Sequence, residues 1–248
     1  MPPIQPPNLL FCATDAGGVR NLVPVARLAA PRFRPVVLVP PTLKPLFPEF
    51  GPELPLPDSV ESANILLDTL LPQAVVCGTA RYPTAEASLT KAARQRGIPT
   101  FAIFDEWYRY RAHFADANGG FRYLPDRICC QDALALQEAQ AEGIPADRLR
   151  ITGSPALAEL AKAAARFRDT PPPRPDPLSQ LQAPTLLFLS ETHAADFGEA
   201  PGSCGPLGPW LGYSEITVRN HLAECAARIG GNLTIIEKLH PGHAPPHL

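Results

Sequence analysis

Short apolar segments recur along the chain, and amphipathic segments of helical period lie between most of them. The apolar runs do not alternate with polar residues, so they predict parallel strands in a sheet that is covered on both faces. Their regular alternation with helices predicts a doubly wound α/β architecture. The predicted strands are residues 9–13, 35–39, 74–77, 100–104, 127–130, 150–152, 185–189 and 233–239, and the predicted helices are 21–30, 60–71, 85–96, 133–142, 156–167 and 215–229.

A proline-rich segment divides this pattern into two parts. Residues 169–177 contain five prolines among nine residues, which predicts a semi-rigid extended linker. We therefore predict an N-terminal Rossmann-like domain over 1–168, a linker over 169–183 and a partial Rossmann-like domain over 184–248. The second domain is expected to be incomplete, because only two strands are predicted in it and a full domain of this type needs about five.

Composition excludes several classes of function. The formal net charge of −2 gives no electrostatic reason to bind nucleic acid or an anionic membrane. No apolar run approaches the roughly 20 residues of a membrane-spanning helix, and the first residues lack the basic and apolar regions of a signal peptide. We expect a cytoplasmic protein whose six cysteines are buried, reduced thiols, and no Cys/His cluster suggests a metal site.

The segment Asp15-Ala16-Gly17-Gly18 follows the first predicted strand. Ligands of doubly wound sheets bind at the carboxyl ends of strands, and glycines let the backbone approach a ligand closely. The first N–H groups of the next helix could bind an anion or a sugar hydroxyl, and Asp15 could cap that helix or accept a hydrogen bond from a sugar. A tight turn with a helix cap is the structural alternative. The segment is not GxGxxG, so a dinucleotide cofactor is disfavoured.

Two further strand ends carry candidate site residues. Thr79 follows the third strand and could bind a ligand or cap a helix. Asp105, Glu106 and Trp107 leave the fourth strand together with Tyr108 and Tyr110. An aromatic platform beside carboxylates suits a sugar, and a carboxylate there could act as a general base. The alternative is a rim of aromatic side chains that pack on helices.

The region 126–155 resembles a known fold family. It runs Asp-Arg-Ile-Cys-Cys-Gln-Asp, then Gly-Ile-Pro, then a strand that ends Thr-Gly-Ser-Pro. This order and spacing resemble the end of the first domain in GT-B glycosyltransferases and UDP-N-acetylglucosamine 2-epimerases. The segment Lys238-Leu239-His240-Pro241 is similar to the Lys-x-His-Pro element of CDP-glycerol glycerophosphotransferase-like proteins. The resemblance covers residues 8–243 and implies two Rossmann-like domains, GT-B-like, with the acceptor on the first and the donor on the second.

The resemblance also implies roles for residues after the linker. Ser190, Glu191, Thr192 and His193 follow the first strand of the second domain, where the loop faces the donor phosphates. Lys238 and His240 are two residues apart, so in a strand they share one face, and cations there suit a diphosphate. The glycine-rich donor segment and the ribose-binding acid of the family are not found in this sequence, so no donor is assigned.

Together these features predict a glycosyltransferase-like enzyme that acts on a nucleotide-activated sugar or polyol phosphate by direct displacement. The expected catalytic residues are Asp105, Glu106, Glu191 and His193, and the expected binding residues are Asp15, Gly17, Gly18, Thr79, Trp107, Ser190, Thr192, Lys238 and His240. The expected partners are a nucleotide-sugar, a sugar or lipid-linked acceptor and a second copy of the chain, with no cofactor. The alternatives are a sugar-nucleotide epimerase and a non-catalytic sugar-, nucleotide- or partner-binding remnant of the fold.

Overall fold

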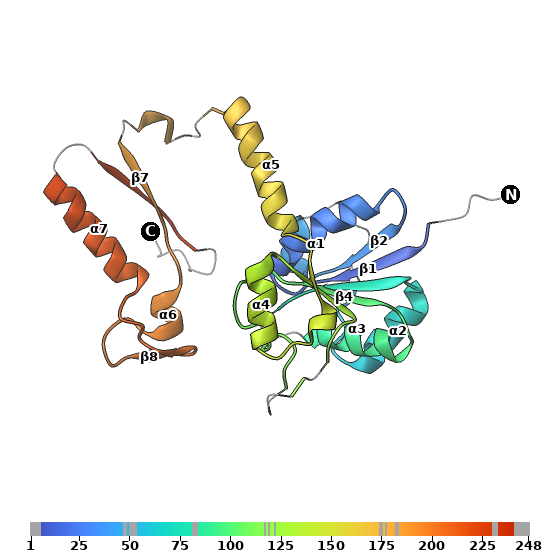
Figure 1. The fold of residues 1–248 in the computed structure, drawn as a ribbon. Helices are drawn as coiled ribbons and strands as arrows, with labels where there is room; N and C mark the ends of the chain where they lie inside the picture. The colour runs from blue at the N-terminus through green and yellow to red at the C-terminus, as the bar shows by residue number, and fades with distance from the viewer. Residues whose placement is uncertain are drawn as a thin grey trace. The chain divides into compact units, whose positions relative to one another are not determined.

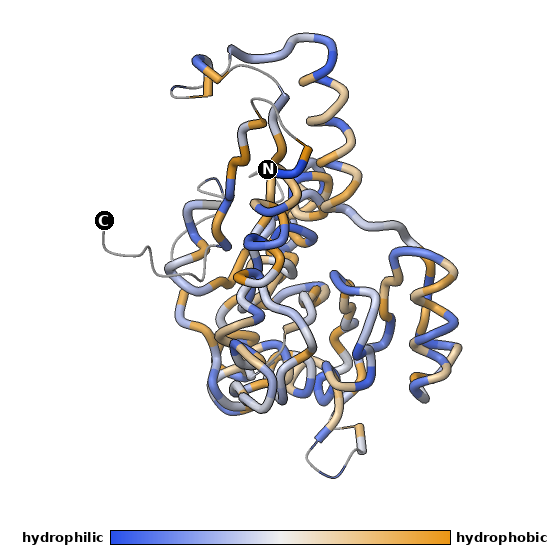
Figure 2. The backbone as a smooth tube through the Cα atoms, turned by 90° about the vertical axis from the view of Figure 1, so that its left-hand side faces the viewer, coloured by the Kyte–Doolittle hydropathy of each residue, from blue (hydrophilic) through white to orange (hydrophobic). Residues whose placement is uncertain are grey.

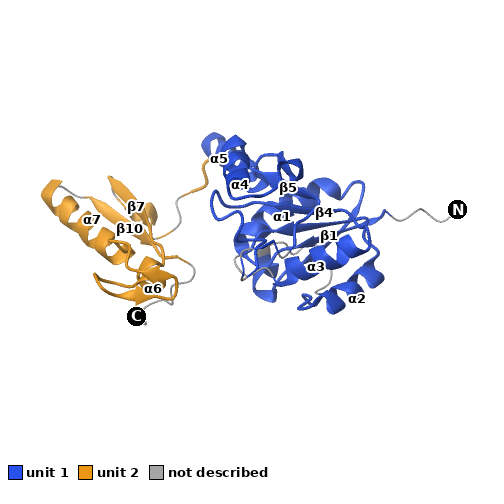
Figure 3. Cartoon of the chain, turned by 60° about the horizontal axis from the view of Figure 1, so that its bottom comes forward, with its two compact units in different colours: residues 1–170 blue, residues 171–248 orange. Residues whose placement is uncertain are grey.

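The computed structural model describes residues 6–46, 49, 54–80, 84–116, 118, 120–121, 123–173, 176, 178–181, 184–229 and 233–240. The chain divides into two compact units, Met1–Thr170 and Pro171–Leu248 (Figure 3). Each unit is described by itself.

Unit 1 is built on a six-stranded sheet in which every strand pair is parallel (Figure 1). The spatial order is β2-β1-β3-β4-β5-β6. β1 lies between β2 and β3, so the strand order reverses at β1 and β3. In sheets of this kind such a reversal of strand order marks the place where ligands bind, at the carboxyl ends of the two neighbouring strands. The strands are β1 (Asn8–Cys12), β2 (Arg34–Leu38), β3 (Ala74–Gly78), β4 (Thr100–Ile103), β5 (Arg127–Cys130) and β6 (Leu149–Ile151).

Both faces of the sheet are covered, as the continuous apolar strands predicted. In β1, Leu10 and Cys12 pack in a cluster with residues of α2 and α3, while Phe11 packs in a second cluster with residues of α1. The helices carry both hydrophobic and hydrophilic residues along their turns, as Figure 2 shows for the whole backbone. The helices of unit 1 are α1 (Ala16–Ala29), α2 (Val60–Leu70), α3 (Thr84–Gln95), α4 (Ala133–Ala141) and α5 (Pro155–Asp169), with short 3₁₀ turns η1 (Pro41–Leu46) and η2 (Ala146–Arg148).

The first helix begins five residues earlier than predicted, at Ala16 instead of residue 21. Asp15 is its N-cap, and its carboxylate accepts a hydrogen bond from the Gly18 N–H at 2.7 Å. This cap offsets the low helix propensity of Gly17 and Gly18, which had suggested a turn. The two glycines therefore lie in the first turn of α1 and not in a loop before it.

Glycines at two positions let α1 approach β3 closely. A Cβ built on Gly78, the last residue of β3, would lie 2.9 Å from the Gly18 Cα and 3.1 Å from the Ala13 Cβ. Real Cβ atoms do not approach a backbone this closely, so a side chain at position 78 would force the helix away from the sheet. The contact fixes the start of α1 directly over the carboxyl end of β3.

Unit 2 has few buried residues. Its parallel strands β7 (Thr185–Leu189) and β10 (Thr234–Lys238) pair along their whole length and were predicted within one residue. Of the hydrophobic residues described in this unit only Ala194 is buried, whereas Leu187 and Leu189 of β7 are more than half exposed. The remaining elements are α7 (Glu215–Ile229), which was predicted, and η3 (Leu178–Gln180), α6 (His193–Phe197) and the hairpin β8 (Cys204–Gly205) and β9 (Gly208–Pro209), which were not.

The prediction that all six cysteines are buried is wrong for two of them. Cys12, Cys77 and Cys130 are buried in the unit 1 sheet and Cys129 is half-buried, but Cys204 and Cys225 are exposed. All six are free thiols. The exposed pair belongs to unit 2, where a two-stranded sheet cannot cover the hairpin and α7.

Replacing Gly78 by Ala is expected to destabilise unit 1 by about 2 kcal/mol, because the added methyl group overpacks backbone that cannot move away. Amide hydrogen exchange of β1 and β3 as a function of urea measures this free energy. The control is Gly120→Ala, whose Cβ would lie 3.3 Å from the end of the Asp116 side chain and should cost less. Equal stability of Gly78→Ala and the wild type would contradict the close contact.

Candidate functional site

The candidate site of unit 1 lies at the carboxyl edge of the sheet, where the strand order reverses. Asp15 follows β1, Thr79 follows β3, Asp105 follows β4 and Gln131 follows β5. The site residues predicted for this unit are thereby brought to one edge by the parallel arrangement of the strands. Predicted binding residues Gly17 and Gly18 belong to the same edge, in the first turn of α1.

Asp105 lies against the beginning of α1. The Thr79 hydroxyl donates to Asp105 Oδ1 at 2.6 Å, and a Cβ added to Gly17 would collide with Asp105 Oδ2. Thr79 is buried, so the hydrogen bond fixes the carboxylate in position. Two carboxylates, those of Asp15 and Asp105, thus occupy the positive end of the helix dipole. The sequence had allowed the first N–H groups of this helix to bind an anion. That interpretation loses support, because a bound phosphate would lie close to the two carboxylates and be repelled by them.

The Asp15 carboxyl has a raised pKa of about 6. Partial burial is the main cause, and the nearby negative charges of Asp105 and Glu106 raise the pKa further, while the hydrogen bond from Gly18 opposes the shift. A carboxyl group with a pKa near neutrality can hold or release a proton under ordinary conditions. The edge therefore contains one carboxyl group that is poised to exchange a proton.

Glu86 of α3 supports the same turn from inside the protein. Its Oε1 accepts hydrogen bonds from the Thr14 N–H at 2.8 Å and from the Thr14 hydroxyl at 2.7 Å. The side chain is almost fully buried, and its Oε2 has no hydrogen-bond partner among the described residues. Burial raises the pKa of Glu86, and the negative charge of Asp15 adds to the shift. Glu86 holds the residue that precedes Asp15, and so it helps to place the Asp15 carboxylate.

The segment after β4 is anchored by residues at the end of β5. The Gln131 side chain donates to the Glu106 carbonyl at 2.8 Å, and the Trp107 ring N–H donates to the Asp132 carboxylate at 2.8 Å. Trp107 is 37% exposed, so part of its side chain is accessible to a ligand. The predicted aromatic platform is wrong for Tyr110, which is fully buried and packs edge-on against the Phe104 ring.

The predicted site residues of unit 2 lie at the carboxyl ends of its two strands. The Ser190 N–H donates to the Lys238 carbonyl at 2.9 Å, which brings Ser190 beside Lys238. Ser190 is buried, and its hydroxyl has no hydrogen-bond partner in the described part of the chain. Glu191 is exposed and His240 is half-buried. Lys238 and His240 were expected to share one face of a strand. Because β10 ends at Lys238, His240 lies beyond the strand and this shared face is not formed.

The residues Thr192 and His193 begin a short helix instead of a loop. Thr192 is the N-cap of α6, and its hydroxyl donates to Asp196 at 2.8 Å. The His193 ring lies 5.9 Å from the Phe197 ring and 5.3 Å from the Tyr213 ring. These ring contacts fix the imidazole in position, which the sequence did not indicate.

Sequence reasoning missed several residues that build the two edges. The signal for Glu86 was available, because it is three and seven residues from Leu89 and Ala93 on the buried face of α3, where an acid is unusual. No local pattern marks Gln131 or His113, whose buried ring bonds the Ala80 carbonyl at 3.2 Å. Their roles depend on contacts between segments that are distant in the sequence.

Within the described residues, no three His, Cys, Asp or Glu side chains are placed to hold a metal ion. The helices of the same residues include none that is long and apolar enough to cross a membrane.

The structure is similar to solved structures of nucleotide-sugar enzymes. UDP-N-acetylglucosamine 2-epimerase from Rickettsia bellii aligns with 96% of this chain at 15% identity and a TM-score of 0.57, over 63% of its own length. The UDP-GlcNAc-bound UDP-GlcNAc 2-epimerase from Neisseria meningitidis aligns with 95% of this chain at 13% identity and a TM-score of 0.61, over 66% of its own length. No family model and no curated protein sequence matches the chain.

These similarities define the class of fold. The chain has a GT-B-like α/β fold with a six-stranded parallel sheet in its first unit and a shortened second unit, as predicted. It spans less than two thirds of the length of the two epimerases.

Replacing Asp15 by Asn is expected to change the pH dependence of stability. The raised pKa means that ionisation of Asp15 costs folding free energy, so this part of the stability is present below pH 3.8 and is lost as the pH rises to about 6. Asn still caps α1 but does not ionise. Relative to wild type, Asp15→Asn should therefore gain about 1 kcal/mol between pH 4 and pH 7, allowing for solvent screening of a partly exposed group.

Urea unfolding at both pH values measures the effect. The control is Asp132→Asn at the N-cap of α4, where hydrogen bonds from Ala135 and Trp107 lower the pKa of Asp132. For this variant no gain is expected between pH 4 and pH 7, because the stability that ionised Asp132 contributes is already present above pH 3.8 and is lost only as the pH falls below that value. Parallel pH trends for wild type and Asp15→Asn would contradict the raised pKa.

Proposed function

We propose that this chain acts on a nucleotide-activated sugar, and that the carboxyl edge of unit 1 binds the hydroxyl-bearing acceptor. The main support is the cluster of Asp15, Asp105 and Glu106, which the partly exposed Trp107 follows in the chain. Carboxylates accept hydrogen bonds from sugar hydroxyls, and an aromatic face stacks on the apolar side of a sugar ring. The same negative charge disfavours a phosphate at this edge, which suits an acceptor better than a donor diphosphate.

The reaction proposed is transfer by direct displacement. Asp105 or Glu106 accepts the proton of an acceptor hydroxyl while the hydroxyl oxygen forms a bond to the activated carbon of the donor. The bond from that carbon to the diphosphate oxygen breaks, and the nucleoside diphosphate leaves with the electron pair. A positioned carboxylate base contributes about 10²–10⁴-fold to such a step.

For unit 2 we propose a role in binding the diphosphate. Lys238 supplies a positive charge at the end of β10, and the neighbouring Ser190 offers a buried hydroxyl without a partner among the described residues. His193 packs against two aromatic rings and can donate a hydrogen bond to a phosphate oxygen. Positive charge and hydrogen-bond donors stabilise the negative charge that develops on the leaving group. Glu191, Thr192 and His240 belong to the same strand ends.

Epimerisation of a nucleotide-sugar is the second candidate. The specific observation in its favour is that the UDP-GlcNAc 2-epimerases have the same fold over nearly the whole of this chain. In that reaction the carboxyl groups would move a proton at a sugar carbon instead of deprotonating an acceptor. The raised pKa of Asp15 suits a group that must both take and return a proton.

Incubation with UDP-GlcNAc in D₂O, with and without a sugar acceptor, separates these candidates. Transfer predicts release of UDP that depends on the acceptor and leaves the sugar without deuterium. Epimerisation predicts deuterium at a sugar carbon without UDP release dependent on the acceptor. Calorimetry measures binding in parallel, and CDP- and GDP-linked substrates extend the same assay. Binding without any turnover would indicate a non-catalytic binding protein, and no binding of any nucleotide-sugar would contradict the proposal.

Asp105→Asn and Glu106→Gln identify the base. One of them should lower turnover by about 10²-fold or more while substrate affinity changes little, because the lost group acts in proton transfer. The matched control is Asp147→Asn, an exposed acid in η2 away from the strand ends, which should turn over at the wild-type rate. Full activity of both test variants would remove the carboxylate base from the mechanism.

A further inference from the structure

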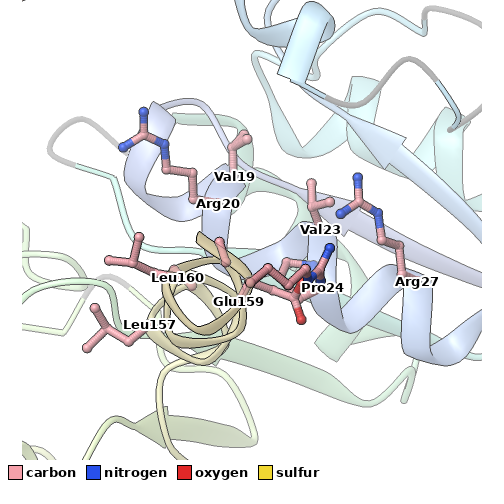
Figure 4. Close-up of a pocket in the computed structure, with 11 residues that line it drawn as sticks. Val19, Arg20, Val23, Pro24, Arg27, Leu157, Glu159 and Leu160 are labelled. Carbon is pink, nitrogen blue, oxygen red and sulfur yellow. The ribbon is translucent and has the colours of Figure 1, made fainter. Parts of the chain in front are cut away.

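A groove between α1 and α5 lies outside the candidate site. It has a volume of about 590 Å³ and is lined on the α1 side by Val19, Arg20, Val23, Pro24 and Arg27. Residues 19 to 27 extend over two turns, or about 12 Å of helix. Figure 4 shows Leu157 and Leu160 on α5 beside these α1 residues. Figure 4 shows α5 nearly end-on while α1 runs across the view, so the groove lies where the two helices cross.

The position of α5 relative to α1 is fixed by hydrogen bonds. The buried Asn21 carboxamide oxygen accepts from the Ser154 hydroxyl at 3.3 Å and from the Ala156 N–H at 3.2 Å. Ser154 is also the N-cap of α5. The start of α5 is thus tied to the middle of α1, so the groove has a defined geometry.

The α5 helix leaves its apolar side chains uncovered. None of its fifteen residues is buried, and Leu157, Leu160 and Phe167 are 50%, 63% and 58% exposed. An amphipathic helix of this length derives most of its stability from packing of its apolar face. Contiguous exposed apolar side chains rimmed by polar ones are typical of an interaction surface.

The charges around the groove are mostly positive. Arg20 and Arg27 lie on the α1 side and Arg166 on the α5 side. Glu159 is the acidic residue in the lining, and it is paired with Lys162 at 2.7 Å. Arg27 is paired with Glu49 at an exposed site, while Arg20 forms no ion pair within the described ranges. An occupant with acidic side chains is therefore favoured, and a second copy of the cationic α5 face is not.

We propose that the groove between α1 and α5 docks an amphipathic helix of a partner protein, with leucine-like side chains on Leu157 and Leu160 and acidic side chains beside the three arginines. The apolar side chains of the groove and the arginines around it match a helix that carries leucines along one face and acidic residues beside them, as in known helix-in-groove complexes. The docked helix covers the exposed apolar side chains of α5. The proposal does not depend on the reaction proposed for the carboxyl edge.

The test uses two synthetic peptides of roughly five turns, both with leucines at helical spacing along one face. One carries glutamates beside the leucines, and its twin carries lysines. Fluorescence anisotropy with the full chain should give a dissociation constant on the order of 10–100 µM for the acidic peptide. Binding of the lysine peptide should be at least about tenfold weaker.

Leu160→Asn and Arg20→Glu should each weaken binding of the acidic peptide about tenfold or more. Both positions are on the surface, so neither change is expected to unfold the chain. The matched controls are Leu134→Asn on α4, where Leu134 is 54% exposed, and Arg32→Glu after α1, which lie outside the groove. The controls should bind as the wild type does.

Several results would overturn the proposal. These are no binding of the acidic peptide, equal binding of its lysine twin, or unchanged affinity in Leu160→Asn. Sedimentation that shows a dimer lost in Leu160→Asn would assign the groove to a second copy instead. Flotation with anionic vesicles that is lost in the same variant would assign it to a lipid surface.

Discussion

The contact between Gly18 of α1 and Gly78 of β3 determines the geometry of the candidate site. A methyl group at Gly78 would overlap the Gly18 backbone, so the helix and strand can meet this closely only where residue 78 lacks a side chain. The contact brings the start of α1 over the carboxyl end of β3, and Asp15 is carried there as its cap. Thr79 and Asp105 follow neighbouring strands and reach the same point. The chemistry of the edge depends on this one close approach.

At the carboxyl edge of the unit 1 sheet, the positive end of the α1 dipole faces carboxylates of the protein itself. Helix starts at this place in doubly wound sheets commonly face phosphate groups. Here Asp15 and Asp105 already lie beside the first turn, and Glu106 follows in the chain. The local charge favours neutral, hydroxyl-rich groups over anions. For this reason the proposed function assigns the acceptor to unit 1 and the anionic diphosphate to side chains of unit 2.

The sequence was sufficient to predict most of the fold. Parallel strands with two covered faces follow from uninterrupted apolar runs, and the structure agrees within one residue at most strand ends. The start of α1 was predicted five residues too late, because the glycine pair lowers helix propensity and the strength of the Asp15 cap is not visible in composition. The small elements α6, β8 and β9 carry too few residues for any periodic signal. Of the candidate site, strand-end position identified Asp15, Thr79 and Asp105. Glu86 could have been found from its place on the apolar face of α3, whereas Gln131 joins the edge through a contact that only the folded chain defines.

Unit 2 is expected to unfold locally more easily than unit 1, because few of its described hydrophobic residues are buried. Unit 1 contains three clusters of buried hydrophobic residues, while the described part of unit 2 buries Ala194 alone among its hydrophobic residues. The free energy needed to expose backbone amides is therefore lower in unit 2. Limited digestion would first remove segments of unit 2 and leave a protected fragment that retains the six-stranded sheet. The two units therefore differ in their resistance to proteolysis, even though they belong to one polypeptide chain.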